Sequence, residues 1–567
     1  MSRAVSPVAP FRGARLFHGV LRCCLLLTLL AAPGCGGRRR PPARSKASAA
    51  PAESPARQPM SREVRERILE GAMDVLGNLE TYDEPVAFAQ VFDRLNQWSH
   101  AVGDAADDPA EGGNRGWRSD PLLETLPERL REGPVTRGLD GMAFDATTDV
   151  VALRDQRWLA DVSGAARGDA IEDLDVAGKL FDWTVRSLAI SSDPPMVPVE
   201  SNPGTRWFST GEVLLAGRAS AAQRAWIFLE LLRHAGLDAV MLATGDAAGG
   251  AWRPWIPAVI SGGEAYLFEP GYGLAVPGPG GKGVATARQA ASDPSILASL
   301  SLPDRPYPVQ AADVARLGVL VPATPSNICR RMHHLDRQLA GARRVDLSLD
   351  ADRLADKALA ALPEPAGAAS GRRKGLWEFP WETAFRRRTL GPKVEQALAR
   401  ELRPMALAVA QGDDGGGQRL FRPLYAGRLR EFRGQFDGPN GAKVAYLAAR
   451  PPNAAIAGLL RGVPPQQADD LKRAYEELKA DATYWLGLLT LAEGEFETAA
   501  DYLGRMTLDA NPDGVWADAA RVNLARARLG MGDRDEAARL LRADESPQRF
   551  GSRILADRLV PQAPPQE

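Results

Sequence analysis

The pattern of apolar residues is densest in the middle of the chain, where it predicts a buried helix. Residues 217–233 read GRASAAQRAWIFLELLR, and from Ala225 onward apolar side chains occur on almost every side of the expected helix. Ser220, with Gln223 three residues later, forms the capping box that starts such a helix. Gly236 stands at the position of a left-handed C-cap. We therefore expect one helix, closed at both ends and buried between other elements.

Three apolar runs after this helix are typical of strands. They cover residues 237–243, 255–260 and 264–269. The second and third runs are separated by Ser261-Gly262-Gly263, a hairpin signal. The order of helix, strand, loop, strand, tight turn and strand predicts an α+β fold, with the helix packed on an antiparallel sheet.

The flanking regions carry mostly a helical period. We expect helices over 61–102 (the second of them near 86–98), 157–162, 174–190 and 326–341, and a strand at 345–349, where apolar and polar residues alternate. Residues 350–440 are rich in Arg, Ala and Leu and predict helices, interrupted at the glycine runs 366–371 and 412–417. The aromatic cluster of Trp377, Phe379 and Trp381 is expected to pack the start of a helix rather than to bind a ligand.

The C-terminal region contains an internal echo. Gly494 and Gly532 are 38 residues apart, and so are Ala499 and Ala537. The pattern resembles the tetratricopeptide repeat, a helix pair of about 34 residues, in which small residues let two helices cross closely. Two or so repeats are few for an independent solenoid. We therefore expect residues 441–560 to form a tetratricopeptide-like helical region that docks on the rest of the chain and binds a protein partner.

The N-terminus is typical of an export signal. Four arginines precede a short apolar run from Cys23 to Ala32, which is too short to span a bilayer. Gly34-Cys35 then resembles a bacterial lipoprotein site, at which the cysteine is lipidated and becomes the new N-terminus. Residues 35–60, rich in Pro, Ala, Ser and Arg, predict a solvated tether. These features predict a membrane-anchored lipoprotein of the cell envelope, facing the periplasm; a simple cleaved signal is the alternative.

Composition and charge exclude some classes of protein. Of the 567 residues, 45% are hydrophobic and 25% charged, which is typical of a globular protein. The formal net charge is −1, and loss of the four signal arginines would make it −5, so nucleic-acid binding is not indicated. Of the four cysteines, two leave with the signal and Cys35 would be lipidated. Cys329 would then be the remaining thiol, which excludes an intrachain disulfide.

Residues 217–270 resemble the transglutaminase-like superfamily, whose papain-like fold matches the α+β unit. The resemblance rests on Gly217, Ala225, Leu231-Leu232-Arg233, Gly236-Leu237-Asp238-Ala239, Trp255 and Phe268-Glu269-Pro270. In that family a cysteine opens the buried helix, a histidine stands two residues before the tryptophan, and an aspartate precedes the proline. The three residues serve as nucleophile, base and orienting group.

The residues at those three positions do not match the family's chemistry. The cysteine position is Ala221, or Ser220 with one residue of slack; the histidine position is Arg253, and the aspartate position is Glu269. Alanine has no nucleophile, and arginine cannot act as a base near neutral pH. The resemblance thus implies the fold without the activity, and we expect Glu269 to neutralise Arg253 in a structural ion pair.

Two further groups are candidates for chemistry. Ser220 lies at a helix N-terminus and could be a nucleophile, but the capping box already accounts for it. Cys329, His333 and His334 lie on one expected helix, with Cys329 and His333 four residues apart on one face. A cysteine-type hydrolase or acyl transferase using Cys329 is therefore the alternative to a non-catalytic protein. No complete metal-ligand or cofactor motif accompanies these residues, so we expect neither metal nor cofactor.

These interpretations divide the chain into seven segments. They are a signal (1–34), a tether (35–60), a helical N-terminal region (61–139), a transglutaminase-like domain (140–345), a helical connector (346–440), a tetratricopeptide-like region (441–560) and a tail (561–567). The combination predicts a non-catalytic envelope lipoprotein that acts in binding or scaffolding.

Overall fold

The computed structural model describes residues 60–102, 120–192, 207–245, 252–364, 374–412 and 418–561. The described residues belong to one compact unit, Met60–Glu567. The export signal, Cys35 and the tether lie outside the described residues and remain predictions.

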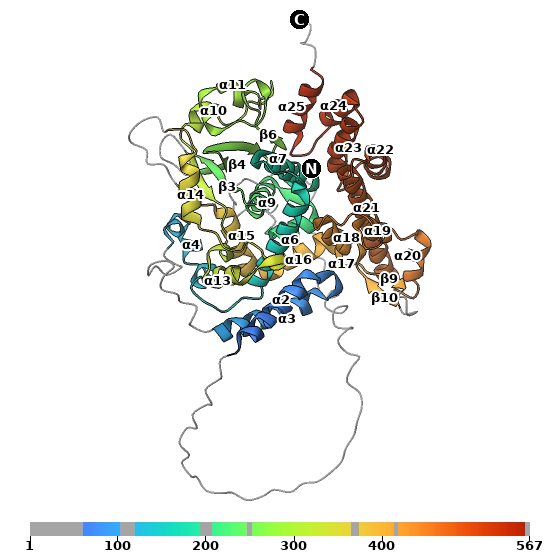
Figure 1. Ribbon diagram of the computed structural model, residues 1–567. Coiled ribbons are helices and arrows are strands. Elements are labelled where there is room, and N and C mark those ends of the chain that lie inside the picture. The colour runs from blue at the N-terminus through green and yellow to red at the C-terminus, as the bar shows by residue number, and fades with distance from the viewer. Residues whose placement is uncertain are drawn as a thin grey trace, which may run out of the picture. The chain divides into compact units, whose positions relative to one another are not determined.

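The centre of this unit is a mixed sheet with the strand order β6-β5-β4-β3-β7-β8 (Figure 1). Its strands are β3 (Asp238–Thr244), β4 (Arg253–Ser261), β5 (Glu264–Glu269), β6 (Leu274–Ala275), β7 (Gly318–Val321) and β8 (Lys374–Leu376). All neighbouring strands are antiparallel except β7 and β8. The β4–β5 turn uses Gly262 and Gly263 at positive φ, as a two-residue hairpin requires. The three predicted strands and their hairpin are confirmed.

The buried helix is α9 (Ala221–His234), which packs on β3 and β4 and is covered by α6 (Asp149–Arg167) and α7 (Asp173–Ser187). The Ser220 hydroxyl accepts from the amide of Gln223 at 3.1 Å, and the Gln223 side chain accepts from the Ser220 amide at 3.0 Å. Gly236 follows at φ 80°. Both predicted helix ends are confirmed, because each depends on contacts within a few residues of sequence.

Further helices and strands surround this centre. In chain order they are α2 (Arg62–Gly77), α3 (Glu84–Val102), α4 (Glu128–Arg131), α5 (Pro134–Arg137), β1 (Ala189–Ser192), α8 (Thr210–Ala216), β2 (Arg218–Ser220), α10 (Ala287–Ser292), α11 (Pro294–Ala298), α12 (Ala311–Val314), α13 (Arg330–Gln338), α14 (Ala351–Ala360), α15 (Glu378–Thr389), α16 (Gly391–Glu401), α17 (Arg403–Ala406), β9 (Val409–Gly412), β10 (Gln418–Phe421) and α18 (Pro423–Phe432). Trp377, Phe379 and Trp381 are buried at the start of α15, as predicted.

Three local predictions were wrong, and at β1 and β8 the reason is that the segment pairs with a strand distant in sequence. The helix expected to reach Ile190 ends at Ser187, and β1 instead pairs in parallel with β2. Residues 345–349 form no strand: the Asp336 carboxylate accepts from the amides of Leu347 at 3.3 Å and Ser348 at 3.2 Å, in place of a strand partner. Residues 350–440 contain β8 and the hairpin β9–β10 besides helices.

The C-terminal part is helical, as predicted (Figure 1). It contains α19 (Ala442–Ala448), α20 (Asn453–Leu459), α21 (Pro465–Ala492), α22 (Phe496–Ala500), a π-helical segment (Asp501–Leu508), α23 (Ala517–Gly530), α24 (Arg534–Arg542) and α25 (Arg549–Leu559). No helix among the described residues has both the length and the apolar character needed to cross a bilayer.

The echoing glycines have a different role from the one expected. Gly494 and Gly532 adopt positive φ, 78° and 83°, after α21 and α23, so they end helices rather than let two helices cross. The close approaches occur at two other glycines. A Cβ on Gly487 would lie 2.8 Å from the Leu503 side chain, and a Cβ on Gly530 would lie 2.4 Å from the Phe496 ring.

The C-terminal helices pack tightly on the preceding chain, as the small number of repeats predicts. The Trp485 ring of α21 occupies the space beside Gly217, where a Cβ would come within 2.1 Å of it. The Arg428 guanidinium of α18 lies over the same ring, 3.6 Å from its centroid. Farther along, the Asn523 amide of α23 donates to the Arg186 carbonyl of α7 at 3.1 Å. The repeat-like helices and the α+β part therefore share one core.

Candidate functional site

The structure brings together two of the three positions implied by the family resemblance. Ala221 is the first residue of α9 and Glu269 is the last residue of β5. A Cβ built on Gly271 would lie 3.0 Å from Glu269 Oε1 and 3.9 Å from the Ala221 methyl. The start of the buried helix and the end of β5 therefore adjoin the same small space.

Glu269 is held in a buried chain of hydrogen bonds. The Tyr307 hydroxyl donates to Glu269 Oε2 at 2.5 Å, and the Gly271 amide donates to Oε1 at 2.9 Å. Trp255 Nε1 in turn donates to the Tyr307 hydroxyl at 2.9 Å. Burial raises the pKa of Glu269 to about 7 although these donors oppose the shift, and burial also raises the pKa of Tyr307.

Arg253, at the histidine position, does not join this chain. It is exposed at the start of β4, opposite Thr244 of β3, and no ion pair links it to Glu269 in the described part of the chain. The expected structural pair was therefore wrong. Tyr307 binds the carboxylate instead, from the segment between α11 and α12. Sequence reasoning missed Tyr307 because it lies 38 residues after Glu269 and no local motif marks it.

The alternative nucleophiles are held in structural roles. The Ser220 hydroxyl caps α9 and is buried. Cys329 is buried before α13, its Sγ donates to the Ser326 carbonyl at 3.4 Å, and burial raises its pKa to about 12. A nucleophilic cysteine needs the opposite shift. His333 lies on α13 as well, and its neighbour His334 is buried against Trp98, with ring centroids 5.2 Å apart. Across the described ranges, no group of three or more His, Cys, Asp or Glu side chains could hold a metal ion.

The C-terminal end of the chain covers the loop that follows Glu269. Gln548 Oε1 accepts from Arg224 Nη1 at 2.5 Å, and the Phe550 ring lies against Tyr272, with centroids 6.2 Å apart. A Cβ on Gly551 would stand 1.8 Å from the Tyr272 carbonyl oxygen. Helix α25 is therefore seated directly on this loop.

Arg224 joins three elements at this junction. Its Nε donates to the Leu188 carbonyl at 2.9 Å, and its Nη1 donates both to the Pro270 carbonyl at 3.0 Å and to Gln548. No carboxylate among the described residues is hydrogen-bonded to this buried guanidinium. Burial lowers its pKa to about 9. The charged guanidinium is therefore bound by neutral oxygens alone among the described residues. Through these bonds Arg224 connects the end of α7, the loop after β5 and the C-terminal helices.

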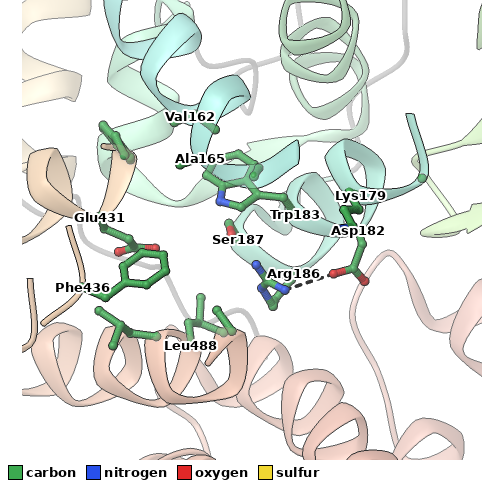
Figure 2. Close-up of a pocket in the computed structure, with 15 residues that line it drawn as sticks. Val162, Ala165, Lys179, Asp182, Trp183, Arg186, Ser187, Glu431, Phe436 and Leu488 are labelled. Carbon is green, nitrogen blue, oxygen red and sulfur yellow. Dashed lines mark hydrogen bonds and ion pairs between the residues drawn. The ribbon is translucent and has the colours of Figure 1, made fainter. Parts of the chain in front are cut away.

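A cavity of about 430 Å³ lies where α6 and α7 face α18 and α21; we call it the seam cavity (Figure 2). Its apolar lining includes Val162, Trp183, Phe436 and Leu488, and its charged lining consists of Lys179, Asp182, Arg186 and Glu431. A second cavity, of about 400 Å³, lies between α6, α8, α9 and α15. Its three arginines, Arg331, Arg387 and Arg388, are paired with Asp149, Glu212 and Asp145.

The family model of the tetratricopeptide repeat matches residues 490–550. This segment is a tetratricopeptide repeat region. Comparisons with the curated proteins and with the solved structures gave no match. The sequence prediction of a repeat-like region over 441–560 is thus confirmed for 490–550.

The tetratricopeptide repeat region contributes to both places described above. Ala492, at its beginning, lines the seam cavity together with the preceding turns of α21. Gln548 and Phe550, at its end, cover the loop after Glu269. Because repeats of this type generally mediate contacts between proteins, the region supports protein binding or scaffolding.

Proposed function

We propose that this protein binds a protein partner through its tetratricopeptide repeat region, and that the α+β part is a non-catalytic support with a transglutaminase-like fold. The observation that carries the proposal is the repeat match at residues 490–550. In keeping with the export signal, we further propose that the protein is anchored in the cell envelope through lipidated Cys35.

The geometry around Glu269 supports the non-catalytic part of the proposal. The position that would carry a nucleophile is a methyl group, Ala221, and Glu269 is bound by Tyr307 rather than by a base. The loop behind it is covered by α25, with Gly551 in contact with the Tyr272 backbone. Because Glu269 is buried, a substrate would have to displace part of the protein to reach it.

The repeat region also exposes an apolar side chain that a partner could cover. Val515 lies between the π-helical segment and α23 and is 65% exposed. It borders a cavity of about 320 Å³ that is also lined by Arg218, Val522 and Pro547. Single exposed apolar residues are common on protein surfaces, but Val515 is the one large apolar side chain within residues 490–550 that is exposed, so we place the partner contact there.

The test is an affinity pull-down of full-length protein from solubilised membranes. Val515→Asp should remove the copurifying partner, because it places a charge in the apolar contact. Ile171→Asp is the matched control, because Ile171 is an aliphatic residue that is 86% exposed and lies outside the repeat region. Retention of every partner by Val515→Asp would contradict docking at this surface. Acyl-transfer or peptidase turnover that is lost on Cys329→Ala would instead favour a cysteine enzyme.

The anchor is tested separately. Cys35→Ala should release the protein from membranes into the soluble fraction, because a lipid-modified N-terminus is the proposed attachment. Mass spectrometry of the wild-type N-terminus should find the acyl groups on Cys35. A mature N-terminus at another residue, without lipid, would end this part of the proposal.

A further inference from the structure

The seam cavity contains polar groups that the protein itself leaves unused. Ser187 and Trp183 of α7 line it, and neither side chain takes part in a hydrogen bond within the described ranges. Glu431 of α18 accepts from Arg428 at 2.7 Å and from the Tyr446 hydroxyl, in both cases through Oε2, so its Oε1 has no donor among the described residues. Figure 2 shows the Ser187 hydroxyl, the Trp183 indole and the Glu431 carboxylate around one common space.

Every charged side chain that lines this space already has an ion-pair partner. Arg186 and Arg526 both bind the Asp182 carboxylate, Arg186 at 3.0 Å, and Arg428 binds Glu431. Lys179 at the rim is bound by Asp169 at 2.7 Å. A ligand with a full charge would therefore lose its hydration without gaining an unpaired counter-ion. An uncharged polar group avoids this cost, provided that both a donor and an acceptor in the cavity can bind it.

A peptide amide meets these conditions. Its carbonyl can accept from the Ser187 hydroxyl or from Trp183 Nε1, and its N–H can donate to Glu431 Oε1. The rest of the lining is apolar, with Phe436 and Leu488 beside the polar groups. Such a surface favours a bulky aliphatic or aromatic side chain next to the amide.

From this geometry we propose that the seam cavity binds an uncharged peptide segment of the partner, with a bulky apolar side chain against Phe436 and Leu488. Its main-chain amides would bond to Ser187, Trp183 and Glu431. This inference rests on the proposed protein-binding function, since the cavity is walled by α21 where the repeat region begins. To that function it adds the chemical nature of the partner segment and the cavity in which the segment binds.

In the first experiment, small probes are titrated with full-length protein, and their binding is measured by ligand-observed NMR. N-acetyl-L-leucinamide, which has a leucine side chain between two uncharged amides, should bind. N-acetyl-L-alaninamide should bind at least about tenfold more weakly than N-acetyl-L-leucinamide, because its side chain buries less apolar surface. Free L-leucine and N-acetyl-L-leucine, which carry charges, should also bind at least about tenfold more weakly. Strongest binding by free leucine, or equal responses to all probes, would overturn the proposal.

The second experiment places the probe in the cavity. Ser187→Ala and Trp183→Phe each remove a donor that has no partner among the described residues, so each should weaken N-acetyl-L-leucinamide several-fold. Ser187→Ala should do so with little change in the unfolding temperature, whereas Trp183→Phe also removes part of a buried ring and should lower it. Trp158→Phe is the control, because Trp158 is a buried tryptophan of α6 whose Nε1 also lacks a partner and which does not line the cavity. Equal affinity in Ser187→Ala, Trp183→Phe and wild type would overturn the assignment.

The two proposals can fail independently. If Val515→Asp loses the partner while no probe binds the cavity, protein binding stands and the peptide site is wrong. If the probe binds as expected while Val515→Asp and Ser187→Ala both retain every partner, the cavity is a small-molecule site and the proposed docking is wrong.

Discussion

The surroundings of Glu269 and the seam cavity differ in whether their polar groups have hydrogen-bond partners within the protein. At Glu269, the carboxylate, the Tyr307 hydroxyl and Trp255 Nε1 bond to one another, and α25 covers the adjoining loop. In the seam cavity, Ser187 and Trp183 have no protein partner among the described residues, and about 430 Å³ remains open. A place whose polar groups bind each other stabilises the fold, whereas unused groups around an open space leave room for a ligand.

The largest effect on stability is expected from disturbing the contact between α25 and the loop after Glu269. Gly551→Ala would place a methyl group 1.8 Å from the Tyr272 carbonyl oxygen, so the backbone must shift. We expect a loss of about 3 kcal/mol or more in the free energy of unfolding, measured by urea denaturation. Gly164→Ala in α6, where no atom lies within 4 Å, is the control and should be neutral or stabilising. A fully stable Gly551→Ala protein would show that α25 is not seated as described.

The pH dependence of stability sharpens the account of Glu269. The pKa of this buried carboxyl is raised from 4.5 to about 7, so the folded protein binds its proton more tightly than the unfolded chain does. Its contribution is therefore complete below pH 4.5 and is lost as the pH rises through about 7. The loss amounts to about 3 kcal/mol at most.

The measurement is urea denaturation of wild type and Glu269→Gln between pH 4.5 and pH 8.5. The difference between their unfolding free energies should shift in favour of Glu269→Gln as the pH rises, because glutamine does not ionise. The same pH dependence in both proteins would contradict a raised pKa at Glu269.

A smaller effect is expected from the hydroxyl that binds Glu269. Tyr307→Phe leaves Glu269 Oε2 without its donor and Trp255 Nε1 without its acceptor, so we expect a loss of about 2 kcal/mol, measured by thermal and urea unfolding. Tyr425→Phe provides the comparison, since the buried Tyr425 hydroxyl has no partner and its removal should be neutral or slightly stabilising. Equal losses in both variants would mean that the Tyr307 bonds add nothing.

The smallest effect is expected in the seam cavity. Ser187→Ala removes a hydroxyl that bonds to nothing in the described chain, so the free energy of unfolding should change by less than about 0.5 kcal/mol. A loss comparable to that of Tyr307→Phe would show that Ser187 is a structural group. The comparison between the two places would then no longer hold.

The sequence predicted the elements whose signals are local. Ser220 and Gln223 are three residues apart, and the glycines of the β4–β5 turn are adjacent, so each prediction needed only a few residues. The repeat region was likewise predictable from a spacing within one segment. By contrast, the alternation of apolar and polar residues at 345–349 predicted a strand, which requires a neighbouring strand as its partner. The amides of Leu347 and Ser348 instead donate to the Asp336 carboxylate.

The candidate site was less predictable for the same physical reason. The chain by itself determined that Ala221 cannot be a nucleophile and that Arg253 cannot be a base, since these are properties of the residue types. It could not determine that Tyr307 would bind Glu269. Nor could it show that α6 and α7 would leave a cavity against α18 and α21, which lie far from them in sequence. Hydrogen bonds and cavities between distant segments depend on how whole elements pack, so only the tertiary structure decided them.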